Sequence, residues 1–98
     1  MAATWFLYML RCGDGTLYTG IATDVARRVA EHEGAGPRGA RYLRGRGPLQ
    51  VALSLEVGPR GDALRLEHRV KRLDRAEKEA LIRRPERARA LLPGPPAC

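Results

Sequence analysis

The sequence predicts an α/β protein of the α+β type, a small three-stranded antiparallel sheet flanked by helices in the order β-β-α-loop-β-α-α. Three short apolar runs, each bounded by glycine, proline or polar turn residues, predict the strands. Segments with helical spacing of apolar residues follow the second and third runs. A chain of 98 residues suffices for one domain with a modest core. We expect this domain to span residues 1–92, followed by a flexible proline- and glycine-rich tail at 93–98.

The first two strands are predicted to form a hairpin. Residues 4–11 (TWFLYMLR) form a short apolar run rich in aromatic residues, which is typical of a buried strand. Residues 16–21 return as the second strand, after the turn sequence Gly-Asp-Gly at 13–15. The length of this turn determines which side chains share a face of the sheet.

Two registers of this hairpin are compatible with the residues. A two-residue Asp-Gly turn, which the dipeptide favours, would place Tyr8 and Tyr18 on opposite faces because side chains alternate along a strand. A three-residue turn, which Gly13 permits by adopting a positive φ, would place both tyrosines on one face, with Tyr8 opposite Gly20. Both registers remain open at this point.

The middle of the chain is predicted to contain a helix, a basic loop and a third strand. Thr23 or Asp24 can cap a helix that continues to about Glu33, and the glycine after it ends the helix. Residues 34–47 (GAGPRGARYLRGRG) contain five glycines and four arginines around a tyrosine, which indicates a basic loop. Residues 49–57 (LQVALSLEV) are the third predicted strand, closed by Gly-Pro.

Helical periodicity resumes near Asp62 and continues to the end of the domain. The apolar stripe of this second helix consists of Ala63, Leu66, Val70 and Leu73. Asp74 and Glu77 form a variant of the capping box and predict the start of a third helix, which stops before Pro85. Residues 86–92 are expected to add one or two further turns.

The net charge indicates which class of molecule the protein binds, and the cysteines indicate the cellular compartment. The formal net charge is +7, and 16 of the 18 basic residues are arginine. Such a balance favours phosphate-bearing partners through counterion release, although a basic protein without a partner has the same composition. Cys12 and Cys98 have neither metal-type nor disulfide-framework spacing. With no signal-peptide pattern and no apolar run of membrane-spanning length, we expect a cytoplasmic protein that does not enter a membrane.

The predicted helices carry charged side chains at positions that should face the sheet. On the first helix, Arg28 and His32 lie one turn apart beside the two valines of that helix. An arginine there must either find an anion or extend along the edge of the sheet to solvent. Glu67, at the margin of the second helix's apolar stripe, is either paired with Arg28 or a metal ligand. Arg27 and Glu31 fall on the opposite side of the first helix and resemble a solvated i,i+4 pair.

These positions give the chain a resemblance to the GIY-YIG nuclease family, in particular to its small stand-alone bacterial members. In that family one tyrosine ends GIY and a second opens YIG after the turn. An arginine, often with a histidine one turn later, follows on the next helix, and a glutamate comes from a later helix. Over residues 5–81, the matching residues are Tyr8 in FLY, Tyr18 in YTG, Arg28 and His32 in VARRVAEH, and Glu67 in ALRLEHRVKRL. The resemblance implies the GIY-YIG fold.

The resemblance also implies an activity, namely metal-dependent endonuclease cleavage of DNA in preference to RNA, selective for nicked, branched or damaged structures. Glu67 would hold a single Mg²⁺ or Mn²⁺, weakly until waters and a substrate phosphate complete its shell. Arg28 would clamp a non-bridging phosphate oxygen, and His32 would contact the same phosphate. Tyr18 or Tyr8 would act as general base or position the attacking water. A base role requires that a cation lower the phenol pKa from its usual value of about 10.

If both phenols serve one phosphate, they must share a face of the sheet and point towards Arg28 and Glu67. The resemblance therefore implies the three-residue turn. The alternative function is a non-catalytic nucleic-acid-binding module that keeps the fold. Its basis is that many family nucleases use an asparagine late in the domain, whereas this chain contains no asparagine.

The basic loop is expected to follow phosphates, with its tyrosine stacked on an unpaired base or packed against the loop. The alternative is a flexible, solvated connection. The candidate nucleic-acid-binding residues are Arg38, Arg41, Tyr42, Arg44, Arg46 and, one turn after Glu67, Lys71. We expect the protein to act as a monomer.

Overall fold

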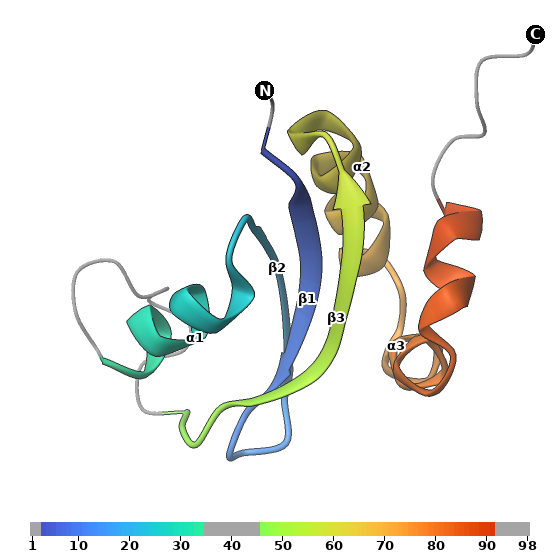
Figure 1. Cartoon of the computed structure of the whole chain (residues 1–98). Helices are drawn as coiled ribbons and strands as arrows, with labels where there is room; N and C mark the ends of the chain where they lie inside the picture. Colours follow the sequence, from blue (N-terminus) through green and yellow to red (C-terminus); the bar gives the residue numbers. More distant parts are fainter. Residues whose placement is uncertain (1–2, 35–45, 92–98) are drawn as a thin grey trace, which may run out of the picture.

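The computed structural model describes residues 3–34 and 46–91 and has the predicted α+β architecture, shown in Figure 1. The elements in chain order are β1 (Trp5–Arg11), β2 (Leu17–Ala22), α1 (Val25–Glu33), β3 (Gln50–Gly58), α2 (Arg60–Lys71), α3 (Arg75–Arg83) and the 3₁₀ helix η2 (Pro85–Leu91). The strands form one antiparallel sheet in the order β2-β1-β3. Helix α1 lies on one face, and α2, α3 and η2 lie on the other. Within the described ranges, no helix has the length and apolar character needed to span a bilayer.

The hairpin of β1 and β2 has the three-residue turn. Tyr8 pairs with Gly20 and Leu10 pairs with Tyr18, so the two tyrosines lie on one face of the sheet. The Cys12 amide donates to the carbonyl of Thr16 at 2.9 Å and closes the turn. The register that brings the two phenols together is therefore the one that forms.

Gly13 and Gly15 divide the roles in this turn differently from our prediction, which gave the positive φ to Gly13. Gly15, with φ of +88°, takes the left-handed conformation that we had assigned to Gly13. Gly13 is instead a close-approach glycine, because a Cβ built there would lie 2.3 Å from the carbonyl oxygen of Gly47. Its amide donates to the Arg46 carbonyl at 2.6 Å. Gly13 thus lets the hairpin turn pack against the segment that enters β3.

Side chains alternate along β1 and sort into two clusters, one on each face of the sheet. Leu7 and Met9 are fully buried and face α2, α3 and η2. They pack with the buried side chains of Leu53, Leu66, Val70, Leu81 and Ala88. Tyr8 and Leu10 point to the other face, where Ala22 and the partly buried valines of α1 cover them. The first cluster is entirely apolar, whereas the second contains a buried phenol.

The helix boundaries follow from local capping. Asp24, rather than Thr23, caps α1, because its carboxylate accepts the Arg27 amide at 3.0 Å. The predicted capping box at the start of α3 is confirmed, with both of its reciprocal hydrogen bonds present. Helix α2 begins at Arg60, earlier than the expected start near Asp62, because Pro59 takes the N-cap position with extended backbone. The extra turns expected at 86–92 form η2, a 3₁₀ helix rather than an α-helix.

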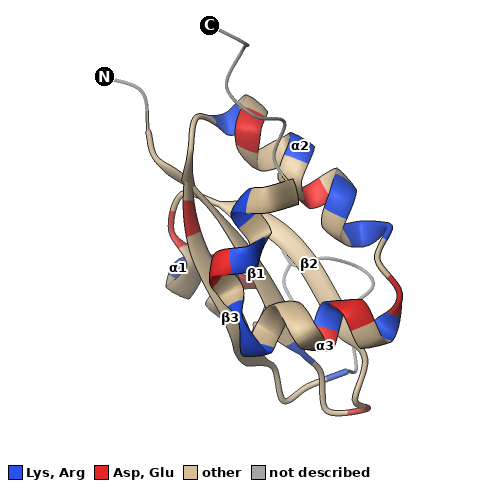
Figure 2. Ribbon diagram, turned by 90° about the vertical axis from the view of Figure 1, so that its right-hand side faces the viewer, with Lys and Arg blue, Asp and Glu red and all other residues tan. Residues whose placement is uncertain are grey.

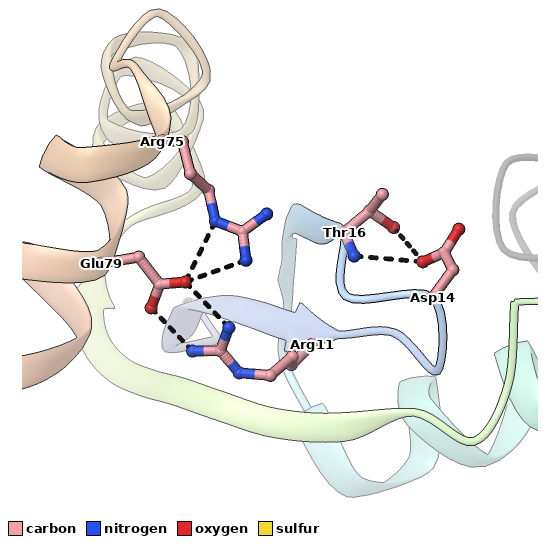
Figure 3. Close-up of polar contacts among 5 residues, drawn as sticks. All are labelled: Arg11, Asp14, Thr16, Arg75 and Glu79. Carbon is pink, nitrogen blue, oxygen red and sulfur yellow. Dashed lines mark hydrogen bonds and ion pairs between the residues drawn. The ribbon is translucent and has the colours of Figure 1, made fainter.

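A long-range ion-pair network that the sequence did not suggest joins α3 to the sheet (Figure 3). Arg11 on β1 donates two hydrogen bonds to the carboxylate of Glu79, at 2.9 and 2.8 Å. Arg75 donates to the same carboxylate at 3.0 Å. The hydrogen bonds from Arg11, followed by those from Arg75, lower the pKa of Glu79 to about 2. The paired arginines thereby fix α3 across the end of β1.

Candidate active site

The two tyrosines lie side by side on the face of the sheet that α1 covers. Their ring centroids are 6.4 Å apart. Tyr8 is buried, whereas Tyr18, on the edge strand β2, is partly exposed. A Cβ on Gly20 would lie 2.5 Å from the Tyr8 hydroxyl oxygen. The absence of a side chain at Gly20 is therefore what lets the Tyr8 phenol lie across β2.

Helix α1 places a histidine and an arginine against the Tyr8 phenol. The buried His32 shares a 3.1 Å hydrogen bond between its Nε2 and the Tyr8 Oη, and its ring meets Tyr18 edge-on at a centroid distance of 5.6 Å. The Arg28 guanidinium lies close enough to the Tyr8 hydroxyl for its positive charge to lower the phenol pKa. The one-turn spacing of these residues thus places both beside the phenols, as the sequence led us to expect.

Glu31 lies closer to this group than we predicted. Its carboxylate accepts a hydrogen bond from Arg28 at 3.1 Å, and its side chain is only 21% exposed. We had placed Glu31 on the solvated side of α1, paired with Arg27. The i,i+3 spacing from Arg28 is the signal in the sequence that points to the observed contact.

Glu67 comes from the helix on the other face of the sheet. Helix α2 packs against β2, and the negative charge of Glu67 acts on the Tyr8 phenol. The Glu67 side chain is 19% exposed, and it forms an ion pair with Lys71, which is 53% exposed, at 3.4 Å. The salt bridge with Arg28 that we considered from the sequence is replaced by this looser pair. The Glu67 carboxylate is thus neither sealed in the core nor held in a dry ion pair.

The electrostatics of the group keep both Tyr8 and His32 in their neutral forms. Burial, with a smaller contribution from Tyr18, raises the pKa of Tyr8 to about 12. Arg28 lowers the pKa of Tyr8 and Glu67 raises it, but neither outweighs burial. Burial and the positive charge of Arg28 lower the pKa of the His32 imidazole. A neutral imidazole can accept a proton at Nε2, where it already meets the Tyr8 hydroxyl.

The donor set around Glu67 fits a weakly bound, hard divalent cation. Across residues 3–34 and 46–91, no group of three or more histidine, cysteine, aspartate or glutamate side chains gathers to hold a metal. One partly exposed carboxylate suits Mg²⁺ or Mn²⁺ when waters and a substrate phosphate supply the remaining ligands. The residues present are therefore compatible with an ion that binds together with its substrate.

The expected nucleic-acid-binding residues are only partly within the described ranges. Arg38, Arg41, Tyr42 and Arg44 lie outside them. Arg46 forms an ion pair with Asp14 in the hairpin turn, so its side chain is bound to the protein itself. Lys71 is exposed beside Glu67. Figure 2 shows basic and acidic residues interspersed along α2 and α3 rather than gathered by sign.

Sequence reasoning missed the role of Gly20, although the three-residue register places it opposite Tyr8. A residue opposite a buried tyrosine on the same face competes with the ring for space, and glycine removes that competition. The combination of that register with a glycine opposite a large aromatic residue is the signal that could have identified it.

Comparisons with known proteins identify the family of the chain. The GIY-YIG catalytic domain matches residues 4–80. A UPF0213 protein from Citrobacter koseri is 50% identical over 88 residues, covering 90% of this chain and 86% of that protein. A UPF0213 protein from Klebsiella pneumoniae is 58% identical over 78 residues, covering 80% and 72%. The solution NMR structure of a UPF0213 protein from Bacillus halodurans is 40% identical, with a TM-score of 0.53 and coverage of 82% and 83%. The chain therefore belongs to the GIY-YIG family, whose catalytic domain spans most of its length.

Proposed function

We propose that the protein is a metal-dependent endonuclease that acts as a monomer and hydrolyses phosphodiester bonds in DNA, with selectivity for nicked, branched or damaged structures. The observation that carries the proposal is the convergence of Tyr18, His32 and Arg28 on the Tyr8 phenol, with the Glu67 carboxylate close enough to shift its pKa. Membership of a nuclease family and the net charge of +7 support it further.

In this proposal, Arg28 binds a non-bridging oxygen of the scissile phosphate. A guanidinium is always protonated and presents a planar set of donors, so it stabilises the extra negative charge that develops on phosphorus oxygens. Glu31 holds Arg28 in place through the 3.1 Å hydrogen bond. A divalent cation bound by Glu67 would supply further charge neutralisation at the phosphate and at the departing oxygen.

The two phenols have different proposed tasks. Tyr18 is partly exposed, so it is the phenol that an attacking water reaches from solvent. Tyr8 is buried, but its hydroxyl lies 3.1 Å from His32 Nε2, which can accept its proton when the imidazole is protonated at Nδ1, and the positive charge of Arg28 acts on its oxygen. We assign the positioning of water to Tyr18 and proton transfer to the Tyr8–His32 pair. With a pKa near 12, Tyr8 does not form a free phenolate at neutral pH, so it would pass its proton to His32 Nε2 while its own oxygen takes the proton of the attacking water.

A second candidate function is a nucleic-acid-binding module without efficient chemistry. Its specific support is the absence of asparagine from the chain, together with a Tyr8 pKa that lies far above neutrality. Such a module would use Arg28, Lys71 and the basic loop to bind phosphates and would bind DNA equally well without a metal ion. In either case, a DNA substrate and the free, buried thiol of Cys12 fit the reducing cytoplasm expected from the sequence.

The test is a cleavage assay on nicked, flapped and fully paired DNA of one sequence, with matched RNA, in Mg²⁺, Mn²⁺ or chelator. Wild-type cleavage should require the metal. Glu67→Gln should lower the rate by about a thousandfold, the upper range for removing one key charge-stabilising group. The matched control Glu86→Gln makes the same change at an exposed site on η2 and should cleave normally. Cleavage that survives Glu67→Gln, or binding with no cleavage in either metal, would reject the enzyme.

A further inference from the structure

A surface pocket adjoins the candidate active site where β2 leads into α1. Its volume is about 200 Å³. Trp5, Ile21 and Ala22 supply apolar lining, and the remaining lining residues come from Thr23, Asp24 and the first two turns of α1. The pocket is therefore formed by a sheet end on one side and a polar helix on the other.

The charges around this pocket balance each other. Arg27 and Arg28 line it, but so do Asp24 and Glu31. The Asp24 carboxylate accepts the Arg27 amide at 3.0 Å, and the Glu31 carboxylate accepts from the Arg28 side chain at 3.1 Å. Because two carboxylates and two guanidiniums line the pocket, a group that enters the pocket itself gains little from carrying a negative charge. A neutral group with both donors and acceptors at its edge and an apolar face fits this lining better.

Trp5, the aromatic residue of the lining, is contacted by a residue of α2 on the other face of the sheet. The guanidinium of Arg60, the first residue of α2, lies 5.5 Å from the centroid of the Trp5 ring. This distance is in the range of a cation–π contact. Trp5 is only partly buried, so part of the indole remains accessible. Indole rings and guanidinium planes are the surfaces on which proteins stack unpaired nucleobases.

We infer that this pocket binds one unpaired nucleobase of the DNA strand, next to the phosphate that Arg28 holds. The inference rests on the proposed function, because Arg28 is shared: it lines the pocket, and its charge acts on the Tyr8 hydroxyl. A nucleobase is a flat, neutral heterocycle with donors and acceptors at its edge. In duplex DNA its faces are stacked and its edge is paired, so it must leave the helix to enter a pocket.

The substrate class follows from this pocket. The preferred substrate has an unpaired nucleotide beside the bond to be cut, as in a flap, a gap or a bulge. A nick between fully paired nucleotides lacks that free base. The pocket therefore separates two kinds of DNA structure that the phosphate contacts alone do not distinguish.

The experiment measures binding in chelator, so that no cleavage is needed. Two labelled DNAs of the same sequence are compared, a nicked duplex and the same duplex with a one-nucleotide thymidine flap. Trp5 is the only tryptophan of the chain, so its fluorescence reports on the pocket directly. We expect the flapped DNA to quench Trp5 and to bind about tenfold tighter than the nicked DNA, in keeping with the stacking of one base. Equal affinity for the two DNAs, or binding that leaves Trp5 fluorescence unchanged, overturns the inference.

Two variants and one control distinguish binding of a base in the pocket from nonspecific electrostatic attraction of DNA. Trp5→Leu should remove the preference for the flapped DNA. Fluorescence anisotropy of the labelled DNA measures the affinities. Arg27→Gln should reduce that preference. Arg83→Gln removes one positive charge on α3, far from the pocket lining, and should lower the affinity for both DNAs by the same factor. A preference that survives Trp5→Leu and Arg27→Gln contradicts the inference. A preference for flapped DNA without metal-dependent cleavage would reject only the proposed endonuclease function. Metal-dependent cleavage without that preference would reject only the inference that the pocket binds a base.

Discussion

The two faces of the sheet are built from the same strands but have different chemistry. On the face covered by α2, α3 and η2, Leu7 and Met9 pack into an entirely apolar cluster. On the face covered by α1, the next residue along β1 is Tyr8, which is hydrogen-bonded to His32 and lies within the electrostatic influence of Arg28. Because side chains alternate along β1, neighbouring residues of one strand point into the apolar cluster and into the polar group on the opposite face.

The polar face depends on the apolar one for its geometry. Phenol, imidazole and guanidinium groups are costly to bury unless they satisfy one another, so they contribute little net stability. The apolar cluster supplies the stability that holds them at fixed distances. Substitutions on the apolar face should therefore change unfolding, and those on the α1 face should change activity.

The largest expected effect is on the apolar face. Leu66 is fully buried between α2 and the sheet. We expect Leu66→Ala to lower the free energy of unfolding by about 2–5 kcal/mol, through lost burial and the cavity that remains. Urea unfolding followed by circular dichroism measures it. Leu64→Ala, on the exposed side of the same helix, is the control and should change stability much less.

The α1 face should respond through activity instead. Gly20→Ala places a methyl group 2.5 Å from the present position of the Tyr8 hydroxyl, so the phenol must move. We expect cleavage to fall about a hundredfold, because displacements near 1 Å disrupt a reacting geometry by that much. Gly61→Ala on α2 is the matched control, since its nearest neighbour would be 3.6 Å away. Normal cleavage by Gly20→Ala would mean that the position of Tyr8 does not matter.

The ion pairs of Glu79 should make the stability of the fold depend on pH. Its pKa is about 2 in the folded protein against an ordinary 4.5, so the folded state favours the carboxylate. The stabilisation is therefore complete above about pH 4.5 and is lost as pH falls towards 2. Wild type should be more stable than Glu79→Gln at pH 7, with the difference shrinking across that window. A difference that stays constant down to pH 2, in urea titrations at each pH, would show that charge is not its cause.

The smallest expected effect concerns a polar group on the apolar face. Thr19 pairs with Met9 in the hairpin, so its side chain points towards α2, where its buried hydroxyl has no hydrogen-bond partner. Thr19→Val should raise the free energy of unfolding by about 1 kcal/mol, because a buried hydroxyl without a partner is unfavourable. Thr16→Val removes a hydroxyl that donates to Asp14 at 2.7 Å and should have the opposite sign. Thermal unfolding of the two variants gives the comparison.

Local patterns in the sequence predicted most of the fold. The capping box at Asp74 and the apolar stripe of α2 act over a few residues, so they can be recognised without the tertiary structure. The hairpin turn was harder, because Asp-Gly favours the shorter loop while the flanking Gly13 permits the longer one. The structure uses Gly15, not Gly13, for the positive φ.

Contacts between distant segments were predictable only in part. The spacing of Tyr8, Tyr18, Arg28, His32 and Glu67 suggested one group. The structure gathers the first four on the face that α1 covers, whereas Glu67 comes from α2 on the other face and acts on the Tyr8 phenol through its charge. The pairing of Arg11 with Glu79 spans 68 residues and depends on how α3 packs across β1, which no local pattern encodes. The pocket beside Trp5 likewise depends on the relative placement of β1 and α1.

The proposed site is tested by locating the metal ion relative to Glu67 and to the phenols on the α1 face. Mn²⁺ is added at substoichiometric levels to the protein bound to a phosphorothioate DNA that resists cleavage, and NMR signals broadened by the ion are mapped onto the structure. The account predicts that resonances of Glu67, Tyr18 and His32 broaden first, while those of Met9 and Glu79 remain sharp. Broadening centred on Asp62 or Glu79, or spread evenly over the acidic residues, would contradict it.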